Sequence, residues 1–301
     1  MFQSTHRLRP VATFSIVAAD VARGELGIAV ASKFLACGAV VPWASAGAGA
    51  VATQSYSNTA YGPDGIRLMR DGLSAEQTLA RLLADDPDRA LRQVGIVDAR
   101  GGSAAHTGSA CHGWAGHQTG PGFACQGNIL VGENTVKAMA ASFQSSNGQA
   151  SNAKLSDRLV MALASGEEAG GDRRGRQASA VYVVKADGGY GGKNDVLIDL
   201  RVDDHPNPVA ELGRLLALQH LYFGSSPQSE KLALEGPLLA ELCGIMRRLN
   251  YLQDPSTGTW DEATAQALDA FTSTENLEER VDLSARTIDA PALAYLRSVF
   301  G

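Results

Sequence analysis

The sequence lacks the apolar runs and the basic excess that mark two large classes of protein. No stretch approaches the roughly 18 consecutive apolar residues of a membrane-spanning helix. The formal net charge of −6 argues against a basic surface for nucleic-acid phosphates. The opening residues include basic side chains but no apolar segment of a secretory signal. We therefore expect a cytoplasmic protein with neither a membrane span nor a nucleic-acid partner.

Cysteine is scarce, and its spacing excludes two further classes. The four cysteines are scattered at positions 37, 111, 125 and 243, which gives no disulfide framework, so reduced thiols are expected. Cys111-His112 with His117 and Cys125 matches no standard zinc site. The small-residue run at 46–49 is not followed by the Gly-Lys-Ser/Thr of a phosphate loop. We predict that the protein uses no metal and no cofactor.

The chain does contain enough apolar material for a large core. Apolar residues make up 45% and charged residues 19%, which is typical of a globular protein. Hydrophobic periodicity predicts strands at residues 11–20, 25–33, 40–46, 49–55, 93–98, 103–107, 123–126, 178–184 and 196–202. It predicts helices at residues 66–70, 74–84, 136–143, 151–165 and 208–222, and loops at 61–65 and 108–122. This order favours a layered α/β sandwich over regular βαβ alternation.

The first strand carries hydroxyl residues on one face. Thr13 and Ser15 alternate with Phe14 and Ile16, as a period of two requires. On the strand at 25–33, small residues share one face, and Lys33 lies on that side. A face of small residues leaves space for a ligand or another backbone.

Seven short blocks, in order along the chain, carry a family resemblance. They are Thr13–Ala18, Ala31–Phe34, Val51–Gln54, Arg92–Asp98, Gln126–Asn128, Gly171–Gln177 and Leu200–His205. Over about Thr13 to Phe223, the sequence resembles the bacterial DUF1028 family. That family is grouped with the N-terminal nucleophile (Ntn) hydrolases, so the resemblance implies an α/β (α+β) fold, a four-layer αββα sandwich. Because the family is named for its unknown function, it implies a mechanistic class but no substrate.

The C-terminal part of the chain resembles a second family. Residues 247–252, 258–264 and 275–280 are similar to the peptidoglycan-binding-like domain often fused to DUF1028. We expect a first domain at 13–223, a linker at 224–235 and a small helical domain at 236–301, with helices at 238–249, 262–271 and 290–300. Because no export signal is present, we interpret this domain as a docking or oligomerisation module rather than a cell-wall binder, and we expect a homo-oligomer.

The resemblance makes Thr13 the candidate nucleophile. In the Ntn mechanism the first residue of the mature chain attacks, and its own α-amine, with an ordinary pKa of about 7.7–8.0, is the base. Twelve residues, Met1–Ala12, precede Thr13 in this sequence. They are interpreted as a cleaved propeptide, a wrongly assigned start or a permanent extension that blocks the amine. The alternative for Thr13 is an ordinary strand threonine.

Charged residues form most of the remaining predicted site. A Lys33 buried beside the nucleophile would lower the pKa of the amine or orient the hydroxyl, whereas Ser32 is expected on the opposite face. Asp172 would orient the amine or hold an arginine, and Arg173 and Arg176 would clamp an acidic substrate. The alternatives are a solvated lysine at a strand end, and a solvated loop or structural ion pair.

The pair Gly127-Asn128 is predicted to follow a strand and to lead towards a helix. Backbone N–H groups at such a turn would bind an oxyanion or a substrate carboxylate. The alternative is a simple strand-to-helix turn.

Two functions are compatible with these residues. The first is an Ntn-type hydrolase that cleaves an amide or related C–N bond of a small molecule or peptide. The second is a non-enzymatic protein that binds a ligand or peptidoglycan and retains the Ntn fold.

Overall fold

The structure, a computed structural model, describes residues 13–146, 153–224, 226–253 and 259–301. Contacts divide the chain into two compact units, one up to Arg214 and one from Leu215 to Gly301. The segment interpreted as a propeptide or extension, Met1–Ala12, lies outside the described residues. None of the helices in the described ranges has the length and apolarity needed to span a membrane.

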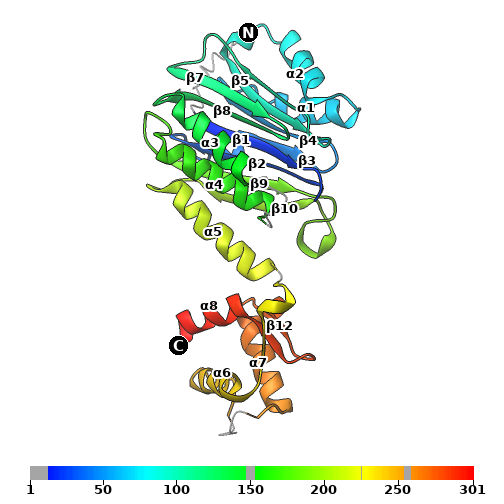
Figure 1. The fold of residues 1–301 in the computed structure, drawn as a ribbon, viewed down its shortest axis with the longest axis vertical. Helices are drawn as coiled ribbons and strands as arrows, with labels where there is room; N and C mark the ends of the chain where they lie inside the picture. The colour runs from blue at the N-terminus through cyan, green and yellow to red at the C-terminus, as the bar shows by residue number, and fades with distance from the viewer. Residues whose placement is uncertain (1–12, 147–152, 225, 254–258) are drawn as a thin grey trace, which may run out of the picture. The chain divides into compact units, whose positions relative to one another are not determined.

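The first unit is built on a six-stranded antiparallel sheet with the order β10-β9-β2-β1-β8-β7 (Figure 1). Its strands are β1 (Thr13–Asp20), β2 (Glu25–Ser32), β7 (Trp114–Gly120), β8 (Phe123–Leu130), β9 (Ala178–Val184) and β10 (Val196–Val202). The first strand of the chain is therefore central in the sheet, between β2 and β8.

A second, four-stranded sheet packs on the first. Its order is β3-β4-β5-β6, with β3 (Pro42–Ser45), β4 (Gly49–Ser55), β5 (Arg92–Asp98) and β6 (Ser103–Thr107). The sheets meet mainly where β1 lies on β4, where β5 lies on β8 and where β6 lies on β7. The side chains between them include Val17, Ile28, Ala50 and Val97, all fully buried. Small and branched apolar side chains therefore form the middle of the interface between the sheets.

Helices cover the outer faces of both sheets (Figure 1). The helices α1 (Tyr61–Arg70) and α2 (Ala75–Ala84) pack on the four-stranded sheet. The helices α3 (Asn134–Ser145) and α4 (Leu155–Glu168) pack on the six-stranded sheet. A fifth helix, α5 (Pro208–Phe223), begins in the first unit and ends in the second. The predicted class, a layered α/β arrangement of sheets and helices, is confirmed at this level.

Most predicted elements are present, and several of them have shifted ends. The strands predicted at 49–55, 103–107, 178–184 and 196–202 have the observed bounds. Ser74 caps α2, as the sequence indicates. Its hydroxyl accepts from Gln77 N at 3.2 Å, and Gln77 Oε1 accepts from Ser74 N at 2.9 Å. Both bonds of a capping box are therefore made.

Two predicted loops are wrong. The segment at 61–65 is the start of α1, because Pro63 lies in the first turn, where a missing N–H is tolerated. The helix also needs glycine there, since a Cβ on Gly62 would overlap with the ring of Trp43. Part of the segment at 108–122 is β7, the edge strand that pairs with β8. Its glycines and polar residues obscure the alternation that predicts a strand.

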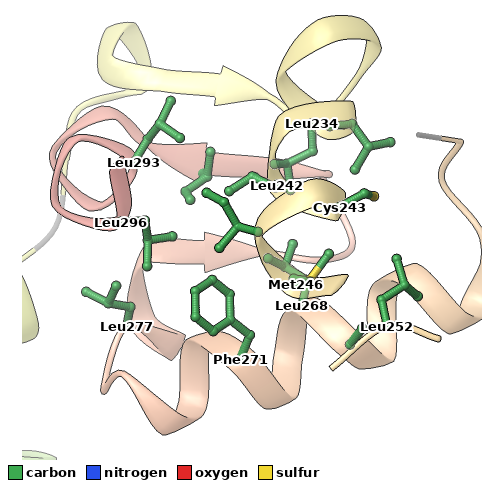
Figure 2. Packing of buried hydrophobic residues seen from close by; sticks show 14 of the residues in the cluster. Leu234, Leu242, Cys243, Met246, Leu252, Leu268, Phe271, Leu277, Leu293 and Leu296 are labelled. Carbon is green, nitrogen blue, oxygen red and sulfur yellow. The ribbon is translucent and has the colours of Figure 1, made fainter. Parts of the chain in front are cut away.

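The second unit is a small module of helices and short strands. Its helices are α6 (Gly236–Arg248), α7 (Glu262–Thr274) and α8 (Ala290–Phe300). Its strands β11 (Lys231–Ala233), β12 (Val281–Asp282) and β13 (Thr287–Asp289) form a sheet in the order β11-β13-β12. In Figure 2, Met246, Phe271 and Leu296 of the three helices enclose one apolar core. The predicted linker at 224–235 thus contains a strand of this module.

A buried arginine, Arg280, holds the end of α5 within the second unit. Its guanidinium donates to the backbone oxygens of His220 and Leu221, which are among the last carbonyls of the helix. It also pairs with Asp289 at 2.9 Å, and the two side chains are only 4% and 6% exposed. The guanidinium therefore satisfies a helix end and a buried carboxylate together.

Replacing Arg280 with alanine should destabilise the second unit strongly. The carboxylate of Asp289 would stay buried without its cation, a loss of about 3–5 kcal/mol in the free energy of unfolding. Arg297→Ala is the matched control, because it removes an exposed ion pair with Glu241 and should change little. Amide hydrogen exchange in α6, α7 and α8 measures the effect. Equal protection in the two variants would contradict the role given to Arg280.

Candidate functional site

Thr13 opens the central strand of the larger sheet and faces the second sheet. Its hydroxyl donates to Ser32 Oγ at 3.2 Å, and both residues are buried. Ser32 lies directly opposite Thr13 in the β1–β2 register, so the hydroxyl shares a face with Ser32 and not with Lys33, the residue predicted beside it. On the other side, the β1–β8 register ends at Phe14 opposite Gly127. Its continuation places Thr13 opposite Asn128.

A network of buried amide side chains lies behind Thr13. Gln54 Nε2 donates to Thr13 O at 3.3 Å and to Gln126 O at 3.4 Å. It also donates to Gln93 Oε1 at 2.9 Å, and Asn128 Nδ2 donates to the same oxygen at 2.9 Å. All four amide residues are 0% exposed. These bonds therefore replace the bonds to water that the amides lose on folding.

Backbone carbonyls fix the direction of the bonds in this network. Gln93 Nε2 faces two backbone oxygens, Gly116 O at 3.2 Å and Gly127 O at 2.8 Å, which can only accept. The Oε1 atom of Gln93 must therefore point the other way, towards the donors of Gln54 and Asn128. The amide of Asn128 is oriented in turn, because only its nitrogen can face that oxygen.

The same reasoning orients Gln54, Ser15 and Gln126. Gln54 Oε1 accepts from Ser15 Oγ at 2.6 Å, and that hydroxyl accepts from Gln126 Nε2 at 2.7 Å. With these directions, two side-chain oxygens of the network receive no hydrogen bond from within it. Among the described residues, neither Gln126 Oε1 nor Asn128 Oδ1 has a hydrogen-bond partner, although both are buried. Such atoms are uncommon in native folds and need a specific explanation.

Two residues with left-handed backbone lie next to this network. Ser55 at the end of β4 and Ile129 after Asn128 have φ of 67° and 52°. A β-branched residue such as Ile129 rarely adopts this region. Its N–H donates to His112 O at 3.0 Å, and its carbonyl accepts from Arg173 N at 3.0 Å. Backbone strain of this kind is concentrated at functional sites.

Asp172 is buried and already has several partners. Its carboxylate accepts from Lys33 N at 3.0 Å and Arg174 N at 2.9 Å. The guanidinium of Arg174 adds an ion pair with an N–O distance of 2.7 Å. Asp172 therefore fixes its own loop against the end of β2, which is the structural ion pair considered as an alternative. Its role in orienting the amine stays a prediction.

Lys33 does not have the burial that its predicted role requires. It is exposed just after β2, and its Nζ donates to Arg176 O at 3.2 Å. This is the solvated strand-end lysine, because the strand ends at Ser32 and leaves the next side chain in water. Arg173 and Arg176 are exposed as well. Their role in binding a substrate stays a prediction.

A small pocket of about 90 Å³ lies beside β1, lined in part by Phe14, Ser32, Glu167, Asp172 and Arg176. Arg176 Nε lies 3.3 Å from Glu167 Oε1. Burial raises the pKa of Glu167, although the charge of Arg176 acts in the opposite direction. The pocket thus offers a guanidinium and a carboxyl group that protonates more readily than usual.

Gly127 and Asn128 lie inside β8, not in a turn after a strand. Their strand runs on to Leu130, because pairing with β1 and β7 continues at Gly127. A Cβ on Gly127 would overlap with the side chain of Leu130, so the close packing there needs glycine. The strand-to-turn prediction is wrong, and oxyanion binding by this backbone stays a prediction.

A larger pocket of about 600 Å³ lies between α1 and α2, on the outer side of the four-stranded sheet. Its buried carboxylate, Asp86, accepts from Arg92 Nε at 2.8 Å and Tyr61 Oη at 2.9 Å. Burial by itself would raise the pKa of Asp86, but the hydrogen bonds from Arg92 and Tyr61 outweigh it and hold the pKa well below its usual range. Asp86 is therefore a paired structural anion.

Comparison with known families now assigns this domain. Residues 13–212 match DUF1028, which is described as a family of unknown function. The chain belongs to the DUF1028 family. Residues 222–296 match a second family, described as "Putative peptidoglycan binding domain". No curated protein is significantly similar to the chain.

The DUF1028 domain is also similar to a solved structure. The crystal structure of protein SPO2555 from Silicibacter pomeroyi, itself assigned to DUF1028, shares 29% sequence identity with this chain at a TM-score of 0.61. The match covers 71% of this chain and 91% of that one. The likeness therefore extends over nearly the whole of that relative.

The residues that organise the candidate site of the DUF1028 domain are mostly uncharged, and their role was not predicted from the sequence. Gln54 ends the block Val51–Gln54, and Gln93 lies in another buried strand. The available signal is a lone amide in an otherwise apolar strand, because such a group must find a partner inside the fold. The scattered cysteines and histidines gave no comparable signal, and no metal-binding group of three such ligands or carboxylates occurs in the described ranges.

Replacing Gly95 with alanine should disrupt this network. A Cβ there would overlap with the amide of Gln126 and force it away from Ser15. We expect the free energy of unfolding of the DUF1028 domain to fall by about 1–3 kcal/mol, measured by chemical denaturation. Gly132→Ala is the control, because no neighbouring atom lies within 4 Å of the added methyl group. Equal stability of the two variants would contradict the prediction.

Proposed function

We propose that the DUF1028 domain is an Ntn-type hydrolase that uses Thr13 to cleave an amide or related C–N bond of a small molecule or peptide. Two facing antiparallel sheets with helices on both outer faces support this proposal, because that is the layer order of the αββα Ntn sandwich. The family description adds no activity of its own.

The observation that carries the proposal is the position of Thr13. It begins the central strand, so a chain that started there would have its α-amine at the end of a buried strand. The hydroxyl of Thr13 is held by Ser32, and its carbonyl oxygen is held by Gln54. When one residue supplies both nucleophile and base, its side chain and backbone must both be fixed, and these bonds fix them.

In the proposed reaction, Thr13 Oγ1 attacks the carbonyl carbon of the substrate while the α-amine takes the hydroxyl proton. The C–N bond then breaks, the leaving nitrogen receives that proton, and an ester remains on Thr13. Water hydrolyses the ester with the amine again as base. Ser32 orients the attacking oxygen, and the backbone at Gly127 and Asn128 is the candidate donor to the developing oxyanion.

The pocket beside β1 favours a small substrate group. Its volume of about 90 Å³ is below the roughly 150 Å³ of a cavity that holds benzene, so it admits a few non-hydrogen atoms. Arg176 would attract a carboxylate, and Glu167 would pair with an amine. Thr13 does not line this pocket, but Ser32, which holds its hydroxyl, does. We therefore propose an amide with a short polar or charged group near the scissile bond.

The proposal requires a broken Ala12–Thr13 bond, so N-terminal sequencing and intact mass should give Thr13 as the first residue. Thr13→Ala should then lower hydrolysis of a responsive amide, found by screening a library of small amides and peptides, by about 10³-fold or more. Thr119→Ala, an exposed change in β7, is the control and should leave hydrolysis intact. A mature chain that starts at Met1, together with full activity of Thr13→Ala, would refute the proposal.

A groove in the second unit favours a second function, binding of peptidoglycan fragments. This groove, of about 430 Å³, is lined in part by Leu239, Trp260 and Arg286. The guanidinium carbon of Arg286 lies 5.6 Å from the centroid of the Trp260 ring. An aromatic side chain beside polar groups suits a sugar ring or a peptide. We propose this ligand class because the description of the matching family names it.

Trp260→Ala in the full chain should weaken binding of soluble peptidoglycan fragments by about tenfold or more, because an aromatic anchor commonly contributes over 1.4 kcal/mol. Isothermal titration calorimetry measures the affinity. Circular dichroism checks the fold, since Trp260 also packs against the core of its unit. Leu249→Ala, which changes a partly exposed residue outside the groove, is the control. Equal affinity of both variants would exclude the groove.

A further inference from the structure

We infer that the side-chain oxygen of Asn128 is the acceptor that positions the α-amine of Thr13 when the chain begins at that residue. The inference rests on the proposed function, because it concerns the base of that mechanism. It starts from Asn128 Oδ1, which is buried and has no partner among the described residues. An acceptor left in this state costs about 1–3 kcal/mol. The site therefore needs a donor that the internal network does not supply.

Asn128 and Thr13 are neighbours on two paired strands. The pairing of β1 with β8 ends at Phe14 and Gly127, and continuing that register by one residue places Thr13 opposite Asn128. Side chains of directly opposite residues share one face, with Cβ atoms about 4.5–5.5 Å apart. That face is turned to the second sheet, because Asn128 bonds to Gln93 of β5. The unpartnered oxygen is thus within reach of the start of β1.

The orientation of the Asn128 amide is determined by its neighbours. Its Nδ2 donates to Gln93 Oε1, whose own amide nitrogen faces two backbone oxygens. A half-turn of the Asn128 amide would place two acceptor oxygens against each other. Asn128 therefore presents its side-chain oxygen as an acceptor to its surroundings.

A terminal amine is the donor that fits this acceptor. Breaking the bond before Thr13 converts an amide nitrogen with one N–H into an ammonium group with three. A neutral amide oxygen can hold one of these without adding a charge. A carboxylate in the same place would raise the pKa of the amine and keep it protonated at neutral pH. An asparagine thus holds the base and leaves it able to accept a proton.

Apart from the exposed Arg173, the charged and titratable groups at this end of the first unit have partners of their own. They are Lys33 on Arg176 O, Asp172 with Arg174, Glu167 with Arg176, His112 with Tyr56, His117 with Thr107, and Cys111 on Arg92 O. None of these partners is Asn128. A change at Asn128 therefore leaves these pairs in place and reports on the amine.

The test uses the full chain with a protease recognition sequence placed directly before Thr13 and cut after folding. The pH dependence of acylation of the new α-amine by a small reagent, followed by mass spectrometry, gives its pKa. A chain with a single Met before Thr13, removed during synthesis, supplies the same amine if the protease cannot reach its site. Because no substrate is used, the result does not depend on hydrolysis.

Asn128→Asp should raise the pKa of the amine by about one unit or more, because a carboxylate would then face the ammonium group. Asn128→Ala should lower it by about half a unit or more, because a hydrogen bond to the charged form is lost. Shifts of opposite sign are the expected signature, since a purely structural role would not produce them. Asn134→Asp adds the same charge at the exposed start of α3 and should leave the pKa unchanged.

Shifts of the same sign, or below about 0.2 unit, in folded Asn128 variants would overturn the inference. Circular dichroism checks folding. If Asn128→Asp does not fold, the sign of the pKa shift in Asn128→Ala decides. The pKa of the amine in Asn128→Ser should then lie between the values of Asn128→Ala and the wild type. If hydrolysis requires Thr13 but the pKa of the amine does not change in the Asn128 variants, this inference is rejected and the proposed function is not. A shifted pKa without any hydrolysis would support it and count against the proposed function.

Discussion

The polar network of the first unit depends on four backbone carbonyl groups, which accept hydrogen bonds but cannot donate them. They belong to Thr13, Gly116, Gln126 and Gly127. Because a carbonyl only accepts, Gln54 and Gln93 must turn their nitrogens towards these oxygens. The directions of the bonds made by Asn128, Ser15 and Gln126 then follow. Buried amides are costly unless they are paired, so this arrangement specifies one register between the two sheets more strictly than apolar contact does.

The polar end and the apolar middle of the sandwich have different effects. Between the sheets, Val17, Ile28 and Val97 supply non-directional burial, which would tolerate small displacements. At the end of β1 the amides allow no such freedom. The left-handed residues Ser55 and Ile129 occur where the strands leave this network, so rigid side chains and strained backbone coincide. That coincidence, more than any single motif, makes this end of the first unit the candidate site.

The sequence predicted the strands with clear alternation, the capping box of α2 and the layered class, because each depends on local spacing. It missed β7, whose glycines and polar residues conceal an edge strand, and it ended β8 too early at Gln126. The candidate site was predicted only in part: Thr13, Lys33 and Asp172 were expected in it, and Gln54 and Gln93 were not. Charge is easy to find in a sequence, whereas the importance of Gln54 depends on which carbonyls it meets across a second sheet.

An uncharged site is what the proposed chemistry requires. An α-amine can act as a base near neutral pH only if its pKa stays close to the ordinary range. A buried carboxylate next to it would hold it protonated, and a buried cation would depress its pKa and weaken it as a base. The charges near Thr13 are instead turned outwards or neutralised in pairs, such as Asp172 with Arg174. Amides and hydroxyls can orient the residue from all sides without changing the charge it experiences, which explains why the strongest candidates for positioning groups carry no charge.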